Sequence, residues 1–512
     1  MNLAQLPMSR SAISAFGTSI PPELAMPRRE RMALLAVATA VTSAALLGIP
    51  LAWLGGWELN HVAGSWVGLA LDLAHGTFYR PLFGPEGFGG TRFMPLYFAL
   101  HAGLIRLFGH PIATGYALSL LSGAALLTGL YALLRTLGVA RFESAACAAL
   151  PLAGASTWSG LVTIRGDLLP VAFGLWGLAA LLQGSERRWS TPVAALCFTL
   201  ALTSKISAGA GLAAGAITIA AGGEPRRAIR LILLVAVGFS ATLVAVDLAT
   251  RGRFLAVLGT CMWGGGRWGG LVMAPTKLAG ELVRQDPGGL CLAVLAAASL
   301  AFHGRGPIVP RLLWGVTLLQ TLVVFSSPGT GPNHLVDLEV ASALVIAVGL
   351  SDAVVGVAYR RAALGLLAAS AFLTAAAHVQ RAERTRPRED RISAALAAAG
   401  ASAGTSDHPL LSEDPLIPIA AGQTPWILDP FMLRLARLRD PDLAGPLLTG
   451  LRSRAFGAVI LLEPLDPDPL GWYEQEHFGP GFSEAVRARY VLFGRAGGYY
   501  IYRPRHEEEV AP

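Results

Sequence analysis

The chain has 512 residues, of which 53% are hydrophobic and only 14% are charged, and its formal net charge is +7. This composition, with a mean hydropathy of +0.53, excludes an ordinary soluble globular protein. The positive charge does not indicate nucleic-acid binding, because the basic residues are scattered among apolar segments, as expected for the inner loops of a membrane protein.

The first apolar run covers residues 32–54 and follows a polar leader, residues 1–31. A cleaved signal peptide normally has a shorter leader and a cleavage site after its apolar core, so this run predicts a membrane anchor. The leader is predicted to be a cytoplasmic tail. Its basic residues are Arg10, Arg28, Arg29 and Arg31.

A long segment that is too polar and too rich in Gly and Pro to span a membrane follows at 55–111, and it opens with Glu58. Residues 58–75 have an apolar face typical of a surface helix. Residues 94–109 could form a further span, but their length and Arg106 favour a helix along the membrane surface. A carboxylate at the membrane surface suits chemistry on a lipid-borne substrate. The alternative for Glu58 is that it caps helix 58–75.

Ten further apolar runs predict membrane helices, several of them short for a full crossing. They cover 112–134, 142–161, 168–183, 190–204, 206–222, 228–249, 288–304, 312–330, 338–357 and 361–379. The sequence therefore predicts a mainly α, polytopic membrane protein with about eleven spans in a domain covering 32–379.

The arginines test this topology independently. If the N-terminus is cytoplasmic, every inner turn carries at least two arginines, as the positive-inside rule requires. They are Arg135, Arg141, Arg187, Arg188, Arg226, Arg227, Arg230, Arg305, Arg311, Arg360 and Arg361. A twelfth span at 94–109 would place all of them outside, so eleven spans are favoured, with residues 380–512 on the outer face.

The tail, residues 380–512, is richer in charge and proline than the rest of the chain. AFGAVILLEP is typical of a buried strand, and YVLFGRAGGYYIYRP predicts a hairpin around a Gly-rich turn. We expect a small extracytoplasmic α/β domain. The four cysteines show no metal or disulfide spacing, and Cys261 falls in a predicted loop that solvent could reach.

With this topology, most unusual polar residues gather on the outer face. Lys205 and Lys277, the only lysines, serve no inner turn, and an ammonium suits a phosphate. The remaining candidates for substrate binding are His61, Asp72, Tyr79, Arg92, Tyr97, Arg165, Asp167, Arg267, Asn333, His334, Asp337 and Glu339.

Each candidate also has a structural alternative. Charged residues near span ends often extend to the interface, and Arg165 and Asp167 could simply tie two helix ends together. Asp337 and Glu339 open a predicted span, where acids favour a helix N-terminus. The histidines lie too far apart in sequence to predict a metal site.

Taken in the order in which they follow one another along the chain, the motifs resemble those of the GT-C superfamily of glycosyltransferases, over about residues 30–380. The similarity is to bacterial members related to protein O-mannosyltransferases and the lipid A aminoarabinose transferase. It is carried by Glu58, LALDLAHGTFYRP, RFMPLYF, the R-x-D pair Arg165 and Asp167, Lys205, and the segment from Asn333 to Glu339. Two departures weaken any transfer of the lipid A activity. A single Glu58 replaces the commoner Asp or acidic pair, and Met94-Pro95 replaces a Pro-Pro pair.

The resemblance implies a polyprenyl-phosphate sugar donor used on the outer face of a bacterial inner membrane, with a lipid, glycan or protein acceptor. Glu58 would act as the base, and a direct displacement should invert the anomeric centre. Lys205, Arg165, Arg92, Arg267 and Lys277 would stabilise the leaving phosphate. No cofactor is expected, and a divalent metal is left open. A transporter or flippase for a lipid-linked substrate is the alternative, and a non-catalytic membrane scaffold is a third hypothesis.

Overall fold

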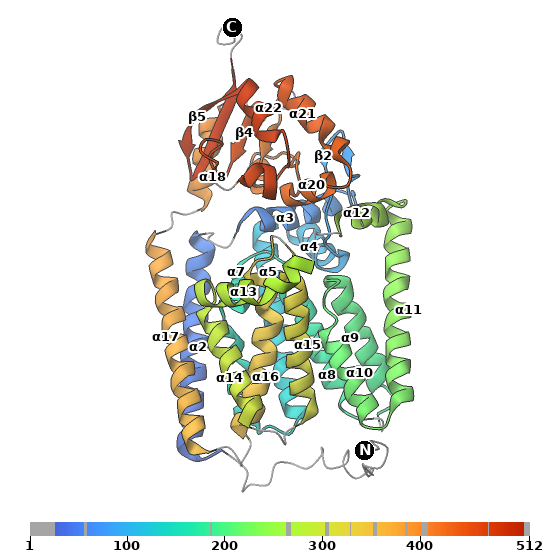
Figure 1. Cartoon of the computed structure of the whole chain (residues 1–512), viewed down its shortest axis with the longest axis vertical. Coiled ribbons are helices and arrows are strands. Elements are labelled where there is room, and N and C mark those ends of the chain that lie inside the picture. The colour runs from blue at the N-terminus through green and yellow to red at the C-terminus, as the bar shows by residue number, and fades with distance from the viewer. Residues whose placement is uncertain are drawn as a thin grey trace.

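The structure is a computed structural model in which a bundle of helices carries a small α/β domain at one end (Figure 1). It describes residues 26–55, 59–184, 187–262, 268–302, 307–327, 329–351, 356–384, 388–400, 408–468 and 471–505. Two predicted site residues, Glu58 and Arg267, lie outside these ranges.

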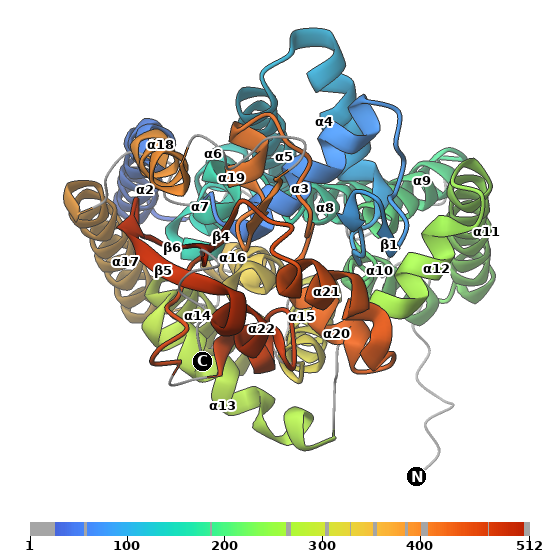
Figure 2. The same cartoon turned by 90° about the horizontal axis from the view of Figure 1, so that it is seen from above.

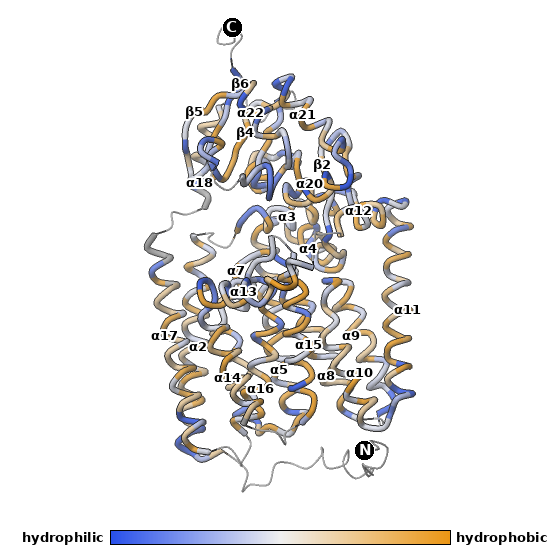
Figure 3. Tube along the Cα trace, in the orientation of Figure 1, coloured by the Kyte–Doolittle hydropathy of each residue, from blue (hydrophilic) through white to orange (hydrophobic). Residues whose placement is uncertain are grey.

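Each of the eleven predicted spans coincides with a helix or a bent pair of helices. Within the described residues, five helices are long and apolar enough to cross a membrane. Four of them are α2 (Arg28–Gly55), α5 (Pro111–Thr136), α11 (Pro225–Ala249) and α15 (Ile308–Phe325). The fifth, Pro332–Ser351, consists of η4 (Pro332–Leu335) and α16 (Val336–Ser351). Shorter apolar helices are α8 (Leu168–Leu181), α9 (Ser190–Ser204), α10 (Ala210–Ala221) and α14 (Pro287–Phe302). The last, α17 (Val357–Arg384), runs past its predicted end. Figure 3 shows the predominantly hydrophobic colouring of these helices, so the chain is a multi-pass membrane protein.

The third predicted span is not straight. It consists of α6 (Arg141–Ala148), η3 (Leu150–Ala153) and α7 (Ala155–Val162), and its two parts are bent by 83°. The break falls at Gly154, whose backbone is extended, directly after the 3₁₀ turn Leu-Pro-Leu-Ala. Because the bend interrupts the helical hydrogen bonds, the first N–H groups of α7 need other acceptors.

Two helices predicted to lie at the membrane surface are found side by side at the upper end of the bundle, α3 (His61–Ala74) and α4 (Pro95–Phe108). Asn60 caps α3, since its side chain accepts hydrogen bonds from the two N–H groups of Val62 and Ala63. The N-cap position that was the alternative role for Glu58 is therefore occupied by Asn60. Arg106 on α4 donates to carbonyl oxygens at the end of α3, at 2.8 and 2.9 Å, which accounts for its charge without a twelfth span.

Two more helices lie on this side, α12 (Arg253–Cys261) and α13 (Trp268–Arg284). Cys261 ends α12 and is fully buried, so the prediction that it lies in a solvent-accessible loop is wrong. The helix places its thiol against the apolar core of the C-terminal domain.

The C-terminal domain contains a four-stranded sheet in the order β3-β4-β6-β5, with β3 parallel to β4 and the other neighbours antiparallel. Its strands are β3 (Leu410–Ser412), β4 (Ala458–Leu461), β5 (Tyr490–Ala496) and β6 (Tyr499–Pro504). Its helices are α18 (Arg388–Ala399), α19 (Leu416–Ala420), α20 (Pro430–Arg437), η5 (Pro441–Ala444), α21 (Gly445–Arg452), η6 (Trp472–Glu476) and α22 (Phe482–Arg489). The predicted hairpin and the predicted strand are confirmed. Gly497 and Gly498 turn the hairpin with φ of 61° and 90°, which suit glycine.

The segment after α3 is built into this domain. Its short hairpin, β1 (Phe83–Gly84) and β2 (Gly87–Phe88), ends in a bridge from Phe88 to Ile427. The N–H of Phe88 donates to the carbonyl of Trp426 at 2.8 Å, and the N–H of Leu428 donates back to Phe88 at 3.0 Å. We call residues 59–94 and the C-terminal domain together the roof. Figure 2 shows the roof seated over the central helices, with α2 and α17 at one edge and α11 at the other.

Candidate functional site

Three predicted site residues meet where the ends of three helices converge beneath the roof. Asp167 precedes α8, Lys205 follows α9, and Asn333 lies in η4. The Lys205 ammonium is 2.8 Å from Asp167 Oδ1, and the Asn333 amide donates to both Asp167 oxygens at 3.3 Å. Together with Arg165 and His334 they form what we call the polar cluster. Asp167 therefore pairs with Lys205, and not with Arg165 as one alternative from the sequence proposed.

The electrostatics of the polar cluster keep Asp167 ionised. Burial opposes its charge, but Lys205, then Arg165 and His334, outweigh this effect and lower the pKa of Asp167 to about 2. Asp337 interacts electrostatically with Lys205 and Asp167. Within the described residues, the Arg165 guanidinium makes no hydrogen bond or ion pair, so its charge is available to an anionic ligand.

Aromatic side chains fix the segment that carries Arg165 and Asp167. Trp66 on α3 stacks on Phe93, with ring centroids 4.1 Å apart, and meets the edge of Tyr97 at 5.1 Å. Gly166 packs so closely here that an added Cβ would lie 3.0 Å from Trp66. Since a side chain would push these rings apart, the glycine lets the two charged neighbours approach the roof.

Tyr97 also ties this segment to α5. Its hydroxyl is 2.9 Å from Ser119 Oγ, which donates to the carbonyl of Thr163 at 2.6 Å. Tyr97 is fully buried, so it positions the α7–α8 connection.

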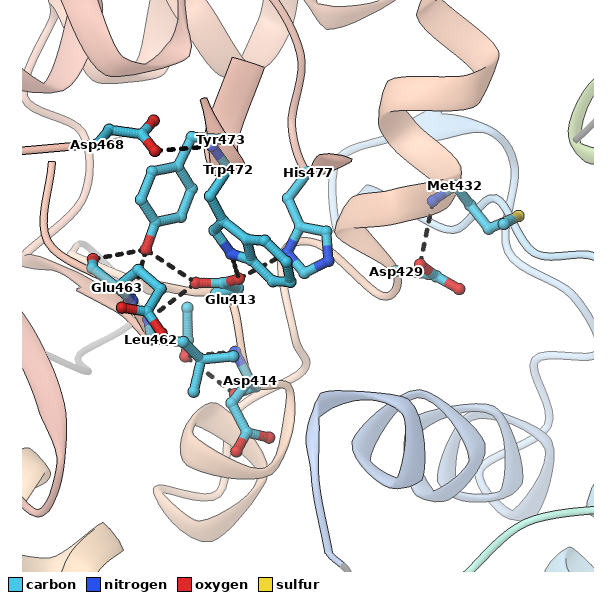
Figure 4. A network of polar contacts seen from close by, with 11 residues as sticks. Glu413, Asp414, Asp429, Met432, Leu462, Glu463, Asp468, Trp472, Tyr473 and His477 are labelled. Carbon is cyan, nitrogen blue, oxygen red and sulfur yellow. Dashed lines mark hydrogen bonds and ion pairs between the residues drawn. The ribbon is translucent and has the colours of Figure 1, made fainter. Parts of the chain in front are cut away.

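The C-terminal domain contributes a buried carboxylate network that the sequence analysis missed (Figure 4). Glu413 accepts hydrogen bonds from His477 Nδ1 at 2.5 Å, Trp472 Nε1 at 2.7 Å, the Leu462 N–H at 2.8 Å and the Tyr473 hydroxyl at 3.2 Å. Burial opposes the charge of Glu413, but these donors, His477 first, hold its pKa below the usual range. The network fixes the His477 ring.

His477 faces His61 on α3. Their ring centroids are 5.1 Å apart, with the rings edge to face. Burial, and then His477, lower the pKa of His61 to about 4, so His61 is neutral at pH 7. Arg165 of the polar cluster and Glu413 of the network in the roof both interact electrostatically with His61. His61 therefore lies between these two groups of residues.

Arg92 forms a second connection between the polar cluster and the roof. Its guanidinium carbon lies 5.7 Å from the ring centroid of Phe431. Burial lowers the pKa of Arg92, and the carboxylate of Asp429 acts in the opposite direction. Asp429 caps α20 by accepting from the Met432 N–H at 3.0 Å, and burial raises its pKa. Arg92 also interacts electrostatically with His334.

Two candidates, Asp72 and Tyr79, are engaged in holding the roof together. Asp72 is 2.7 Å from the buried guanidinium of Arg80, which also donates to the carbonyl of Pro425 at 2.9 Å. The Tyr79 hydroxyl donates to the carbonyl of Phe93 at 2.8 Å. Lys277 is exposed on α13, outside the polar cluster.

Glu339 supports the bend in the third span. Its carboxylate accepts from the N–H groups of Ser156 and Thr157, at 3.1 and 2.8 Å, and from the Thr157 hydroxyl. A second buried acid, Asp286, accepts from the Ala155 N–H at 2.8 Å and the Ser156 hydroxyl at 3.0 Å. The two carboxylates satisfy the N-terminus of α7. Asp286 was missed, although Asp before Pro-Gly-Gly is a typical helix start.

The network in the roof had one recognisable signal in the sequence. Glu413 and Asp414 directly follow the apolar strand β3, at the carboxyl end of a parallel strand pair, where α/β domains commonly place functional groups. Within the described ranges, no group of three or more His, Cys, Asp or Glu residues could hold a metal ion.

Comparison with known proteins shows similarity in structure alone. No family model and no curated protein matches the sequence. The structure of ArnT from Cupriavidus metallidurans bound to undecaprenyl phosphate aligns with 91% of this chain and 98% of its own, at 13% identity and a TM-score of 0.58.

The archaeal oligosaccharyltransferase AglB from Archaeoglobus fulgidus, in complex with an inhibitory peptide and a dolichol-phosphate, is also similar. It aligns with 93% of this chain and 75% of its own, at 12% identity and a TM-score of 0.51. The Archaeoglobus fulgidus oligosaccharyltransferase tethered to an acceptor peptide aligns with 92% and 74%, at 12% identity and a TM-score of 0.54. This chain therefore shares its overall fold with these proteins, in agreement with the resemblance that its sequence motifs carry.

Proposed function

We propose that this protein is a membrane glycosyltransferase that moves a sugar from a polyprenyl-phosphate-linked donor to an acceptor on the outer face of the membrane. The observation that carries this proposal is the polar cluster, which places Arg165, Lys205 and Asp167 together at the end of a GT-C bundle. The similar ArnT structure holds undecaprenyl phosphate, and the AglB structure holds dolichol-phosphate.

The cations of the site suit a leaving phosphate. As the bond from the anomeric carbon to the phosphate oxygen breaks, negative charge grows on the phosphate, and fixed cations stabilise it most strongly in a buried site. Arg165 is free of partners within the described chain, and Lys205 is held by Asp167 in one position. Arg92 approaches from the roof. These three residues are proposed to bind the donor phosphate, and Arg267 and Lys277 remain further candidates.

Glu58 is proposed as the base. It takes the proton from the acceptor hydroxyl or amine, whose oxygen or nitrogen forms a bond to the anomeric carbon. The bond to the phosphate oxygen breaks, and its electron pair leaves with the polyprenyl phosphate. A single displacement inverts the anomeric configuration. Since phosphate is already a good leaving group, no second carboxylic acid is required, in contrast to glycoside hydrolysis. No cofactor takes part in this scheme.

The orientation follows from the arginines. The polar cluster and the C-terminal domain lie at one end of the bundle, and arginine-bearing turns such as those before α9 and α11 lie at the other (Figure 1). The positive-inside rule makes the arginine end cytoplasmic. We therefore propose that the N-terminus lies inside and the roof outside, and the resemblance described above makes a bacterial inner membrane the proposed location.

One observation favours the second candidate function, a transporter or flippase. Transporters often build substrate sites at broken helices, and the third span is bent by 83°. In this chain, however, the N-terminus of α7 is already occupied by the carboxylates of Asp286 and Glu339. An occupied helix end is not available to a substrate, and this argues for the glycosyltransferase.

The test is mass spectrometry of lipids and glycans from host cells that carry the wild type, a deletion, Glu58→Gln or Lys205→Met at matched protein levels. Arg361→Gln, at the opposite end of the bundle, is the matched control. We expect one sugar-sized addition to disappear in the deletion and both site variants, while its polyprenyl-phosphate donor accumulates. If the deletion alone has a phenotype and Glu58→Gln and Lys205→Met behave as wild type, the proposed chemistry is refuted and the transporter is favoured.

A further inference from the structure

A cavity of about 710 Å³ opens at the end of the bundle opposite the polar cluster. It lies where α9 and α11 begin, and five arginines line it: Arg187, Arg188, Arg226, Arg227 and Arg230. Figure 3 shows the hydrophilic colouring at the start of α11. Since α9 begins here and ends next to Lys205, roughly 20 Å of helix separate this cavity from the polar cluster. No proposed step of sugar transfer uses it.

One of the five arginines holds the fold together. Arg227 donates to the hydroxyls of Thr191 and Ser190 at 2.9 and 2.8 Å and to the carbonyl of Leu181 at 2.8 Å. It also forms an ion pair with Glu224 at 3.1 Å. The Arg227 and Glu224 charges therefore neutralise each other, and Arg227 joins the ends of α8, α9 and α11.

The other four arginines have no acidic partner in the described part of the chain. Arg226 and Arg230 are exposed one helical turn apart on α11, so their like charges face the same side. Arg187 contacts only an amide oxygen, at 2.7 Å, and the Arg188 guanidinium lies 5.7 Å from the ring of Trp189. Four cations that pair with no acid among the described residues, placed around one cavity, favour an anion.

The backbone adds to this preference. Both α9 and α11 begin at the cavity, so their helix dipoles favour negative charge there. Trp189, exposed at the start of α9, is a residue type typical of the level of the lipid headgroups. Next to the cavity, α11 presents exposed apolar side chains, including Ile229, Leu233 and Val237, along the bundle surface.

We propose that this cavity binds the phosphate headgroup of an anionic membrane lipid, whose acyl chains lie along α11. The positive-inside rule accounts for arginines on this face, but not for four of them around one cavity with two helix N-termini. Basic pockets between membrane helices on this side bind anionic headgroups. The exposed apolar side of α11 favours a lipid over free phosphate. The proposal does not depend on the proposed function, because it rests on other residues.

The experiment measures the thermal unfolding of the purified full chain in a neutral detergent with phosphatidylglycerol, cardiolipin, phosphatidylcholine or inorganic phosphate added. Native mass spectrometry counts the retained lipid. The cavity variant is Arg226→Gln with Arg230→Gln. The control is Arg141→Gln with Arg361→Gln, which removes the same charge from the same end of the bundle but outside the cavity. Arg227 is left unchanged, because its loss would disturb the fold.

The anionic lipids are expected to raise the unfolding temperature and stay bound to the wild type and the control. The cavity variant should bind them at least about tenfold more weakly. Equal weakening in the control would overturn the proposal, because total charge would then explain binding. Stabilisation by inorganic phosphate as strong as that by the lipids would overturn the lipid assignment, and so would equal binding of phosphatidylcholine.

Discussion

Glu413 is expected to contribute strongly to the stability of the roof. Its carboxylate is fully buried and accepts four hydrogen bonds, from His477, Trp472, Leu462 and Tyr473. Replacing it with alanine leaves four buried donors without the acceptor that they share. The indole and backbone N–H groups left behind would each cost about 1–3 kcal/mol if they stayed unpaired. Because these contributions overlap, we expect Glu413→Ala to destabilise the C-terminal domain by about 3–5 kcal/mol.

Glu413→Gln removes the charge of the side chain but keeps its shape. The amide keeps the volume, its oxygen can still accept from Leu462 or Trp472, and its NH₂ can donate to His477 Nδ1 if the imidazole changes tautomer. We expect a loss of only about 1–2 kcal/mol. Glu463→Gln is the control, because the Glu463 side chain is exposed and its backbone supplies the contacts to Tyr473.

The assay is thermal unfolding of the full chain in detergent, followed by limited proteolysis that reports on the C-terminal domain separately from the bundle. At roughly 4 °C per kcal/mol for a domain of this size, Glu413→Ala should lower the transition by about 10–20 °C. Glu463→Gln should leave it unchanged. If Glu413→Ala unfolds within about 2 °C of the wild type, the energetic role assigned to the buried carboxylate is refuted.

Three further predictions concern the polar cluster, the contact between β2 and the C-terminal domain, and acid stability. Lys205→Met should reduce sugar transfer, measured as product formation at matched protein levels, about 10²-fold or more while the chain stays folded. If the unfolding temperature falls together with the activity, the ion pair is structural instead. Gly87→Ala should destabilise the roof by about 3 kcal/mol or more, because φ is positive and an added Cβ would collide with the Trp426 carbonyl. The control is Gly76→Ala, where φ is also positive but the added Cβ meets no atom; it should cost only about 1–2 kcal/mol in the same proteolysis assay. Because the pKa of His61 is lowered to about 4, the unfolded chain binds the proton first, so stability should fall as pH drops from about 6.5 to 4, and His61→Gln should abolish that part of the loss in pH-dependent unfolding.

The helices were predictable because burial in lipid demands long apolar runs, and the sequence shows them directly. The run 190–204 matches α9 at both ends, and Gly497-Gly498 marks the turn of the hairpin. The bend at Gly154 was not predictable. The acids that satisfy α7, Asp286 and Glu339, come from distant parts of the chain, and hydrophobic periodicity carries no information about such partners.

The candidate site was predictable where topology alone brings residues together. Asp167, Lys205 and Asn333 all lie at outer ends of predicted spans, so one assumption about orientation places them on the same face. Glu413 and His477 are 64 residues apart in a domain without a repeating pattern, and only the folded sheet brings them together. Asp72 was predicted to bind substrate, and nothing in its surroundings in the sequence indicates the ion pair with Arg80.

The contact between β2 and the segment around Ile427 joins parts of the chain that are made far apart in time. Ribosomes make the chain from its N-terminus, so the segment with Gly87 and Phe88 is made long before its partners Trp426 and Leu428. Until then, Arg80 lacks the carbonyl of Pro425, and α3 has no domain above it. A chain truncated before Pro425 therefore lacks the contacts that join β2 and Arg80 to the C-terminal domain.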